Sequence, residues 1–406
     1  MQRSWRTPVV VLICGTLVML LSFGIRQTYG LFLTPISDTL GWPRGVFSLA
    51  VALQSLIWGL AQPFLGGLAD RYGSAKVVAL SAVAYMAGLY LMSVSTDPLS
   101  MTLSTALLTG VAMSGTSFSL VLAVIGRSAP AKWRGLYLGI GSAGGSSGQF
   151  LVVPFTQVFL SSHGWVETLV VLALVAGLIV PLSAALAENT PAAAQRDQTL
   201  WQALGEARRH SGYLLLTAGF FVCGFQTLFI AQHLPALLVD NGLSPGLGAT
   251  AISLLGFFNV FGCLAAGALG NRYSKKNLLS FIYFMRAVVM TGFFLVPMTD
   301  TSVIVFSSVM GLLFLSTIPL TSGIVAQVFG TRYMAMLYGI VFLDHQIGSF
   351  IGIWLGGVLF DYTGSYDIVW WTAVGLGVAA AIIHYPIDER AISRTVPAAA
   401  AGASAP

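Results

Sequence analysis

The sequence predicts an all-α membrane protein with twelve transmembrane helices in two pseudo-symmetric six-helix bundles. Of its 406 residues, 56% are hydrophobic and only 8% are charged, whereas soluble proteins carry roughly 25% charged residues. In addition, the segment GGLADRYGSAK at 66–76 recurs in degenerate form as GALGNRYSKK at 267–276. An internal repeat of this length indicates two halves with the same order of helices.

Twelve stretches are long and apolar enough to cross a hydrocarbon core, which takes about 20 residues per helix. They begin near residues 8, 46, 75, 98, 134, 166, 212, 246, 276, 301, 333 and 367. We expect residues 1–187 to form an N-terminal bundle and residues 212–390 a C-terminal bundle. Residues 188–211, where charge and proline occur together, are expected to form a cytoplasmic linker, and residues 391–406 a disordered tail.

Two segments outside the regular spans need a separate interpretation. In the linker, Thr199 is placed to cap a short helix in which Trp201 and Leu204 oppose charged residues. This helix lies on the cytoplasmic membrane surface or acts as a solvated spacer. At the N-terminus, the apolar run continues to Pro35 without a small-residue cleavage site, so we interpret it as the first transmembrane helix and not as a signal peptide.

The placement of positive charge predicts the topology. The net charge is +5, but the basic residues gather at the termini and in the even-numbered connections, and only Arg44 is expected on the opposite side. Positive residues favour the cytoplasmic side of a membrane, so both termini are predicted to be cytoplasmic and nucleic-acid binding is not expected. The sequence contains no Asn-x-Ser/Thr acceptor, which favours a prokaryotic inner membrane. We expect a monomer in the lipid bilayer, without a metal or other cofactor.

A second pair of similar segments supports the duplication. WRGLYLGIGSAGGSSGQF, from Trp133, aligns with YMAMLYGIVFLDHQIGSF, from Tyr333, so that Gly148 matches Gly348. Glycines spaced in this way let helix backbones approach closely. Static packing and sliding of one helix past another explain these glycines equally well.

These motifs resemble the major facilitator superfamily over essentially the whole chain. Within it, RGLYLGIGSAGGSSG at 134–148 is similar to the stretch that opens helix 5 in monocarboxylate porters and oxalate/formate exchangers. RQTYGLFL at 26–33 resembles the segment in which that branch places a basic residue facing the cavity. The resemblance implies two bundles that rock about a site near the middle of the membrane, and hence a secondary transporter and not an enzyme.

The sequence also departs from that branch in three places. The acidic motif that precedes helix 1 in animal members is replaced by Arg6-Thr7-Pro8. The acidic and arginine pair of helix 8 appears as Asn259 and Cys263, and the lysine of helix 11 is absent, with Asp344 and His345 nearby. The substrate therefore cannot be transferred from the best-known members.

Charged residues inside the predicted spans mark the candidate binding site, because a charge at the bilayer centre costs about 2.5–3.5 kcal/mol on insertion scales. We expect Arg26 to bind the substrate anion through two parallel hydrogen bonds, with Tyr29 close by. The alternative is a structural arginine neutralised by Asp344. The neutral candidates for hydrogen bonding in the cavity are Gln149, Gln226 and Asn259.

Asp344 and His345 are the candidates for proton coupling, since imidazole has a reference pKa of about 6.5. Adjacent helical residues point about 100° apart, so we expect one to face the cavity and the other a neighbouring helix. A buried pair with satisfied hydrogen bonds is the alternative. Arg286 and His233 also lie within spans, where we expect them to have structural partners.

The repeated loop is the candidate for conformational gating. In relatives this motif latches the cytoplasmic side, and Asp70 is placed to pair with a basic residue or with the positive end of a helix. The second copy has Asn271 instead, so the latch is expected to be asymmetric; the alternative is a loop that only sets topology. The gating residues predicted are Gly66, Asp70, Arg71, Gly73 and Arg134.

The function predicted is secondary transport of a small organic anion, a monocarboxylate, together with a proton or in exchange for a counter-anion. The sequence contains no GxxxxGK[ST] loop, so ATP is not the expected energy source. Two other functions remain open on the same scaffold. One is export of amphipathic drugs or metabolites, which the uncharged helix 8 favours and Arg26 disfavours. The other is a sensor that binds its ligand without transporting it.

Overall fold

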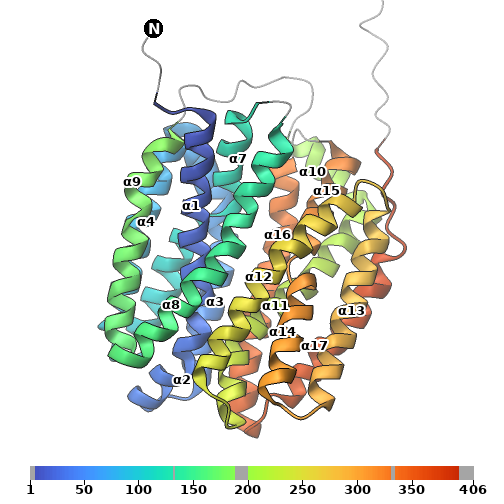
Figure 1. The fold of residues 1–406 in the computed structure, drawn as a ribbon. Helices are drawn as coiled ribbons and strands as arrows, with labels where there is room; N and C mark the ends of the chain where they lie inside the picture. The colour runs from blue at the N-terminus through green and yellow to red at the C-terminus, as the bar shows by residue number, and fades with distance from the viewer. Residues whose placement is uncertain (1–4, 131–132, 188–199, 331–333, 393–406) are drawn as a thin grey trace, which may run out of the picture.

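The computed structural model describes residues 5–130, 133–187, 200–330 and 334–392. Within these ranges the regular structure is entirely helical, as predicted. The first half of the chain, blue to green, and the second half, yellow to red, form two bundles that stand side by side (Figure 1). The chain enters and leaves at the same end of the molecule, which we call the terminal side; the opposite end is the distal side.

Among the described residues, the N-terminal half contains ten α- and π-helical segments, because several crossings are broken into shorter pieces. In chain order they are α1 (Pro8–Gln27), α2 (Tyr29–Leu40), α3 (Arg44–Tyr72), α4 (Ser74–Ser93), α5 (Pro98–Thr102), the π-helix η1 (Leu103–Thr109), α6 (Gly110–Gly115), α7 (Phe118–Ser128), α8 (Arg134–Gly177) and α9 (Ile179–Ser183). A 3-10 turn, η3 (Ala184–Leu186), follows.

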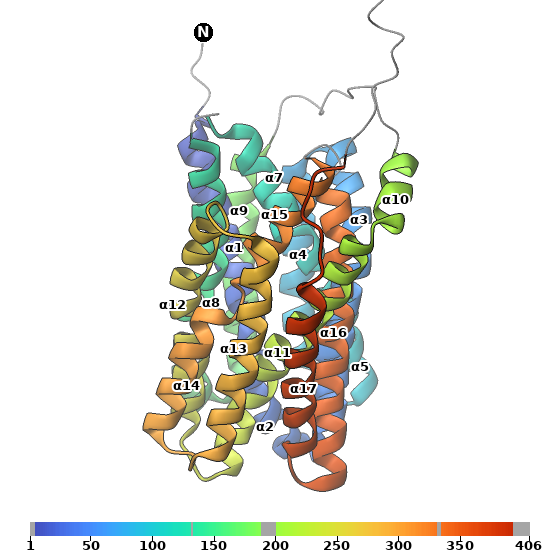
Figure 2. The same cartoon turned by 90° about the vertical axis from the view of Figure 1, so that its right-hand side faces the viewer.

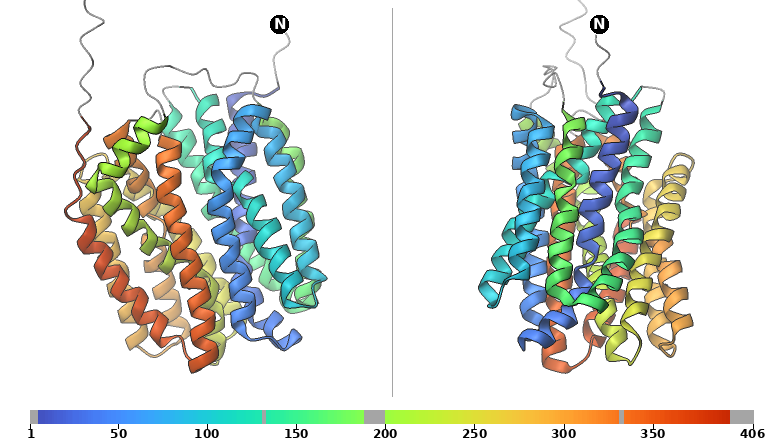
Figure 3. Two further views of the ribbon diagram at one scale, coloured as in Figure 1. Left: turned by 180° about the vertical axis from the view of Figure 1, so that it is seen from behind. Right: turned by 60° about the vertical axis from the view of Figure 1, so that its left-hand side comes forward.

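The C-terminal half is preceded by a short helix and has fewer breaks. In chain order its helices are α10 (Leu200–Arg209), α11 (Ser211–Asp240), α12 (Pro245–Leu269), α13 (Lys275–Leu295), α14 (Asp300–Leu313), α15 (Thr317–Phe329), α16 (Met334–Thr363) and α17 (Asp367–His384). The side views show that the long helices run between the terminal and distal sides (Figures 2 and 3).

These helices account for the twelve predicted crossings. Eleven segments of the described chain are long and apolar enough to span a membrane, and one of them, Gly139–Leu186, has 48 residues. A straight helix of that length would measure about 72 Å, more than twice a hydrocarbon core of about 30 Å. The segment reverses direction at Gly164, whose φ of 83° is not helical, and therefore crosses twice (Figure 1).

Local sequence explains where the crossings start and stop. The Thr7 hydroxyl accepts a hydrogen bond from the Val10 amide at 3.3 Å, and Pro8 occupies the first helical position of α1. Gly41 ends α2 with φ 67°, and Gly73 ends α3 with φ 95°, values that favour glycine over residues with a side chain. The second copy of the loop turns without a glycine at the equivalent position, where Ser274 has φ −58°.

Glycine contacts reproduce the internal repeat in three dimensions. A Cβ atom added to Gly148 on α8 would lie 2.0 Å from the carbonyl oxygen of Leu20 on α1, and one added to Gly348 on α16 would lie 2.0 Å from that of Phe221 on α11. The first contact lies within the N-terminal half and the second within the C-terminal half. At these two positions the glycines therefore pack helices closely inside each bundle.

The fourth and tenth crossings are interrupted within their apolar segments. The fourth changes direction between α6 and α7, where Ser117 is extended (φ −80°, ψ 168°). The tenth is interrupted between α14 and α15. Ser117 and Ser316 are about two hundred residues apart, so the two interruptions are related by the repeat, although both crossings are continuous apolar runs in the sequence.

The linker helix expected from the sequence is present as α10, at the terminal side (Figure 2). Ala203 and Ala207 are buried, so its apolar face packs against the protein itself. Thr199, the expected cap of this helix, lies outside the described residues. So do residues 188–199 of the linker and the predicted tail beyond Ile392.

Candidate functional site

Arg26 lies at the break between α1 and α2 and is 3% exposed. Its Nη2 donates to the Ser55 hydroxyl of α3 at 3.1 Å, and its guanidinium carbon lies 5.3 Å from the centre of the Tyr29 ring. Its Nε has no hydrogen-bond partner in the described structure. No described carboxylate, Asp344 included, forms an ion pair with it.

Several other buried polar atoms on α2 and α3 also have no partner among the described residues. They are the Tyr29 hydroxyl, the side-chain oxygen of Gln54 and the indole nitrogen of Trp58. Tyr29 follows Arg26 by one turn, and Gln54 and Trp58 flank Ser55 on α3. Leaving a buried polar group without a partner costs about 1–3 kcal/mol, so this group is suited to a polar ligand.

A chain of hydrogen bonds connects this group to the C-terminal half. The Gln346 amide of α16 donates to the carbonyl oxygen of Ser55 at 3.1 Å. The Nδ1 atom of His345 lies 3.1 Å from the side-chain oxygen of Gln346, while its Nε2 has no described partner. Arg26 and His345 therefore belong to one polar layer that spans both halves.

An aromatic layer lies one helical turn nearer the terminal side. It consists of Phe23 on α1, Trp58 on α3 and Phe342 on α16. The ring of Trp58 is 5.4 Å from that of Phe23 and 5.5 Å from that of Phe342, both edge-on. Phe342 also stacks on His345 at 5.3 Å. The polar layer is thus bordered by a large apolar surface on one side.

Asp344 lies on a different face of α16 from His345. His345 lies on the face of α16 that packs against α11, because a Cβ atom added to Gly224 on α11 would lie 1.8 Å from the His345 carbonyl oxygen. Gln346 lies on the face that packs against α3, where it approaches Gly59. Because successive residues point about 100° apart, Asp344 shares a third face with Ile340, which is 38% exposed. Asp344 is half-buried and has no hydrogen bond or ion pair in the described structure.

The three neutral candidates divide into two groups. Gln149 and Asn259 lie between the halves: the Gln149 amide donates to the Ile252 carbonyl oxygen at 2.8 Å, and the Asn259 amide donates to the Ser146 hydroxyl at 3.0 Å. Gln226 faces the other way and donates to the Ala373 carbonyl oxygen of α17 at 2.8 Å. The structure therefore does not bring Gln226 to Arg26.

Arg286 supports the interruption of the tenth crossing. Its Nε and Nη2 donate to the carbonyl oxygen of Leu313 at 3.1 and 2.9 Å, and Nη2 also donates to that of Phe314. The Asn259 oxygen accepts from the Leu315 amide at 2.9 Å. These side chains satisfy backbone groups that the interruption leaves without helical partners. His233 is also occupied, because its Nε2 lies 2.7 Å from the Ile353 carbonyl oxygen.

The predicted gating residues lie on the terminal side. Gly66 is within α3, and Gly73 ends it. Asp70, Arg71 and Arg134 belong to α3 and α8, but their side chains lie outside the described part of the structure. Their pairing therefore stays a prediction.

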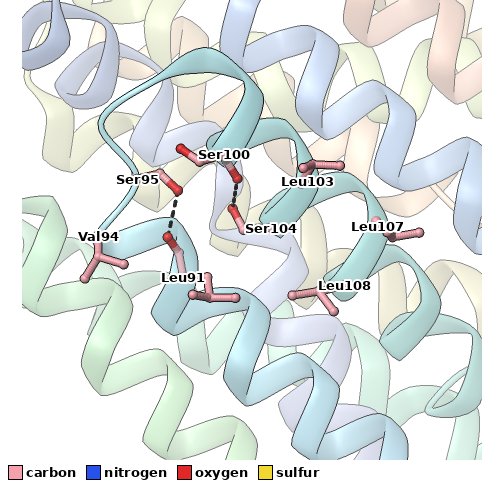
Figure 4. A pocket seen from close by; sticks show the side chains of 8 residues that line it. All are labelled: Leu91, Val94, Ser95, Ser100, Leu103, Ser104, Leu107 and Leu108. Carbon is pink, nitrogen blue, oxygen red and sulfur yellow. Dashed lines mark hydrogen bonds between the residues drawn. The ribbon is translucent and has the colours of Figure 1, made fainter.

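Two cavities lie at the edges of the molecule, away from the polar layer. One, of about 410 Å³, is a groove at the distal end of α4, lined by Leu91, Val94 and Leu103 with two serines that bond to backbone carbonyls (Figure 4). Leu91 and Leu103 are well exposed, as on a surface that meets lipid. The other, of about 420 Å³, is lined by Asp240, Tyr366 and their neighbours.

The sequence analysis did not predict several members of the polar and aromatic layers, among them Ser55, Trp58 and Gln346. Ser55 is a small residue in an apolar run, with no distinguishing signal. Trp58 is an aromatic residue of a kind common in membrane helices. Gln346 could have been predicted, because a glutamine inside a predicted span needs a polar partner. The prediction was instead based on its neighbours Asp344 and His345.

The chain matches the family model described as Major Facilitator Superfamily over residues 13–343. It is 26% identical to the uncharacterized MFS-type transporter YcxA of Bacillus subtilis (strain 168), covering 90% of this chain and 91% of that protein. It is 24% identical to monocarboxylate transporter 13 of Rattus norvegicus (90% and 86%) and 23% identical to the oxalate:formate antiporter of Oxalobacter formigenes (93% and 91%).

The fold is also similar to solved transporter structures. A bacterial homologue of the human lysosomal transporter Spinster, in an inward-facing and occupied conformation, superposes with a TM-score of 0.73 over 94% of this chain and 97% of that one, at 16% identity. At this identity the similarity concerns the fold alone.

Proposed function

We propose that this chain, which belongs to the Major Facilitator Superfamily, is a secondary transporter that carries a small organic anion, a monocarboxylate, across the prokaryotic inner membrane. The observation that carries the proposal is the buried Arg26 guanidinium, whose Nε has no described partner and which has no described counter-ion. A cation kept in this environment is costly, and a bound carboxylate would neutralise it. The similarity to monocarboxylate transporter 13 supports a monocarboxylate, and the similarity to the oxalate:formate antiporter supports the broader class of small organic anions.

The arrangement of donors favours one carboxylate per substrate. Arg26 offers Nε to one carboxylate oxygen, and the ring of Tyr29 lies 5.3 Å from its guanidinium carbon. Arg286 is a buried arginine in the C-terminal half. It already donates to backbone carbonyls and is not free to bind a second carboxylate. A dicarboxylate would therefore leave one charge without a cation. The aromatic layer offers contact to the apolar part of a monocarboxylate.

Transport is proposed to proceed by rocking of the two bundles about the polar layer, coupled to a proton or to a counter-anion. His345 is the titratable group that the hydrogen-bond chain joins to the Arg26 site through Ser55 and Gln346. We therefore favour it over Asp344 as the proton carrier, because Asp344 lies on another face of α16. With both termini in the cytoplasm, as the charge distribution favours, the terminal side is the cytoplasmic side.

A thermal-shift screen of the purified full-length protein tests the substrate class. Mono-, di- and tricarboxylates and lipophilic cations are compared at equal concentration. A ligand at 100 times its Kd stabilises the folded protein by about 2.7 kcal/mol, so a monocarboxylate should raise the unfolding temperature while the other classes do not. Stabilisation by lipophilic cations alone would identify an exporter of amphipathic compounds instead. Binding without flux in proteoliposomes would identify a sensor.

A further inference from the structure

Arg44 joins the two halves at the distal side. It begins α3 in the N-terminal half, and its Nη1 and Nη2 donate to the two carboxylate oxygens of Asp240 at 2.6 and 2.7 Å. Asp240 is the last residue of α11 in the C-terminal half. The guanidinium carbon also lies 4.1 Å from the centre of the Phe360 ring. A bidentate pair of this geometry is strong and directional.

A second carboxylate, on another helix of the C-terminal half, binds the start of α3. Asp361, on α16, accepts hydrogen bonds from the backbone amides of Arg44 at 3.0 Å and Gly45 at 2.7 Å. These amides open α3 and have no partner within the helix, so Asp361 caps a helix of the opposite half. The Tyr366 hydroxyl accepts from Nη1 of Arg44 at 3.1 Å, and burial raises the pKa of Tyr366 to about 12, which keeps this hydroxyl neutral.

Beneath these charges the two halves meet backbone to backbone. A Cβ atom added to Gly357 on α16 would lie 2.6 Å from the Ser48 hydroxyl of α3, and one added to Gly30 on α2 would lie 2.4 Å from the carbonyl oxygen of Ala231 on α11. In the view from behind, the distal end of α16 lies beside the start of α3 (Figure 3, left). At these two positions the halves therefore lie too close together to admit a side chain.

We propose that Arg44, Asp240 and Asp361 form a latch that holds the distal side of the transporter closed and must open in each cycle. All the bonds of the latch join an N-terminal helix to C-terminal elements, so the two bundles cannot separate at this side while the bonds persist. The latch acts on the conformational equilibrium and does not touch Arg26. It goes beyond the proposed function, because it holds for any substrate.

The test measures access to position 48, where the native Ser48 is buried one turn inside Arg44. A protein with Cys14, Cys223 and Cys263 replaced by alanine carries Ser48→Cys in nanodiscs, where a bulky maleimide reaches both faces. Arg44→Gln should raise the labelling rate of this cysteine by about tenfold or more, the change expected from losing a charge-assisted network. Asp240→Asn and Asp361→Asn should raise it as well, each by a smaller factor.

Two matched controls keep the result specific. Arg390→Gln removes an arginine that is paired with Asp388 on the terminal side, 91% exposed, and should leave the labelling rate unchanged. Ser307→Cys places the reporter in α14, buried inside the C-terminal half, where the latch variants should have no effect.

Two outcomes would overturn the proposal. One is unchanged labelling of the Ser48→Cys reporter in the folded latch variants. The other is equal acceleration at the Ser307→Cys reporter, because that would indicate general loosening of the protein and not opening of the distal side. If Arg44→Gln does not yield folded protein, the two carboxylate variants decide.

Discussion

At the scale of single residues, three charged or titratable groups that look equivalent in the sequence have different environments. Arg26 retains a donor without a described partner, whereas Arg286 gives its hydrogen bonds to backbone carbonyls. His345 reaches the polar layer through Gln346. A buried charge is tolerated where it has hydrogen-bond partners or a ligand. The hydrogen-bond partners of a side chain, and not its burial, therefore distinguish a binding residue from a structural one.

Arg26→Ala should weaken binding of the anion while leaving folded protein in the membrane. Hydrogen bonds to a charged group contribute about 1.5–3 kcal/mol, and 1.4 kcal/mol corresponds to a factor of ten in Kd, so affinity should fall by about 10- to 100-fold. Arg26→Lys should restore part of it, because an ammonium lacks the planar fork. Calorimetric titration with the monocarboxylate found in the screen measures the effect. Wild-type affinity in Arg26→Ala would refute the assignment.

His345→Gln should separate exchange from proton-driven accumulation. Exchange returns a loaded carrier and needs no net proton release, whereas accumulation driven by a pH gradient does. We expect His345→Gln proteoliposomes to keep counterflow and to lose uptake driven by an inward proton gradient. Asp344→Asn is the matched control on the other face of α16 and should keep both. If His345→Gln retains full gradient-driven accumulation, the protein is better described as an anion exchanger.

At the scale of elements, the interrupted crossings show how the two halves diverge from a common plan. In the fourth crossing, small hydroxyl groups support the turn: Ser22 and Thr116 lie 2.6 Å apart, and Ser114 donates to the Trp58 carbonyl oxygen at 2.8 Å. In the tenth, Arg286 and Asn259 provide this support. Non-helical backbone at membrane depth requires such partners, because lipid offers none.

Arg286→Met should therefore destabilise the protein through the tenth crossing. The substitution preserves an apolar stem but leaves the carbonyl oxygens of Leu313 and Phe314 without their donors. Losing these bonds should lower the free energy of unfolding by about 3 kcal/mol or more, measured by thermal or denaturant unfolding in detergent. Cys223→Ser changes a neighbour whose sulfur lies 3.6 Å from Arg286 and should cost far less. Equal stability of Arg286→Met and the wild type would show that the interruption does not need the guanidinium.

At the scale of the whole molecule, the sequence predicts the helices well and the contacts between halves poorly. The apolar runs locate all twelve crossings, because a membrane span is a property of about 20 consecutive residues. Contacts such as Arg44 with Asp240 join residues 196 positions apart, and Gln346 with Ser55 residues 291 apart. No local pattern encodes them. The interruption at Ser117 was also hidden, since serine and threonine are compatible with a continuous apolar helix.

The closure of the distal side yields a final prediction for the whole cycle. Gly30→Val places a branched side chain where even a Cβ atom would lie 2.4 Å from the Ala231 carbonyl oxygen, a backbone atom that cannot rotate away. The two halves then cannot meet at this side, so the variant should remain open there, keep measurable ligand binding and lose transport. Labelling of Ser48→Cys in this background should be fast even with Arg44 intact.

Gly139→Ala is the control for this variant, because a Cβ atom there meets nothing within 4 Å and transport should be unaffected. If Gly30→Val transports normally, α2 and α11 can move apart enough to admit the valine side chain while the distal side stays closed. The distal closure would then depend on the Arg44 latch alone. Slow labelling of the Ser48→Cys reporter together with lost transport would instead place the defect outside the distal closure. Loss of transport with fast labelling is the outcome that the close backbone contact requires, since a carrier that cannot close one side cannot complete alternating access.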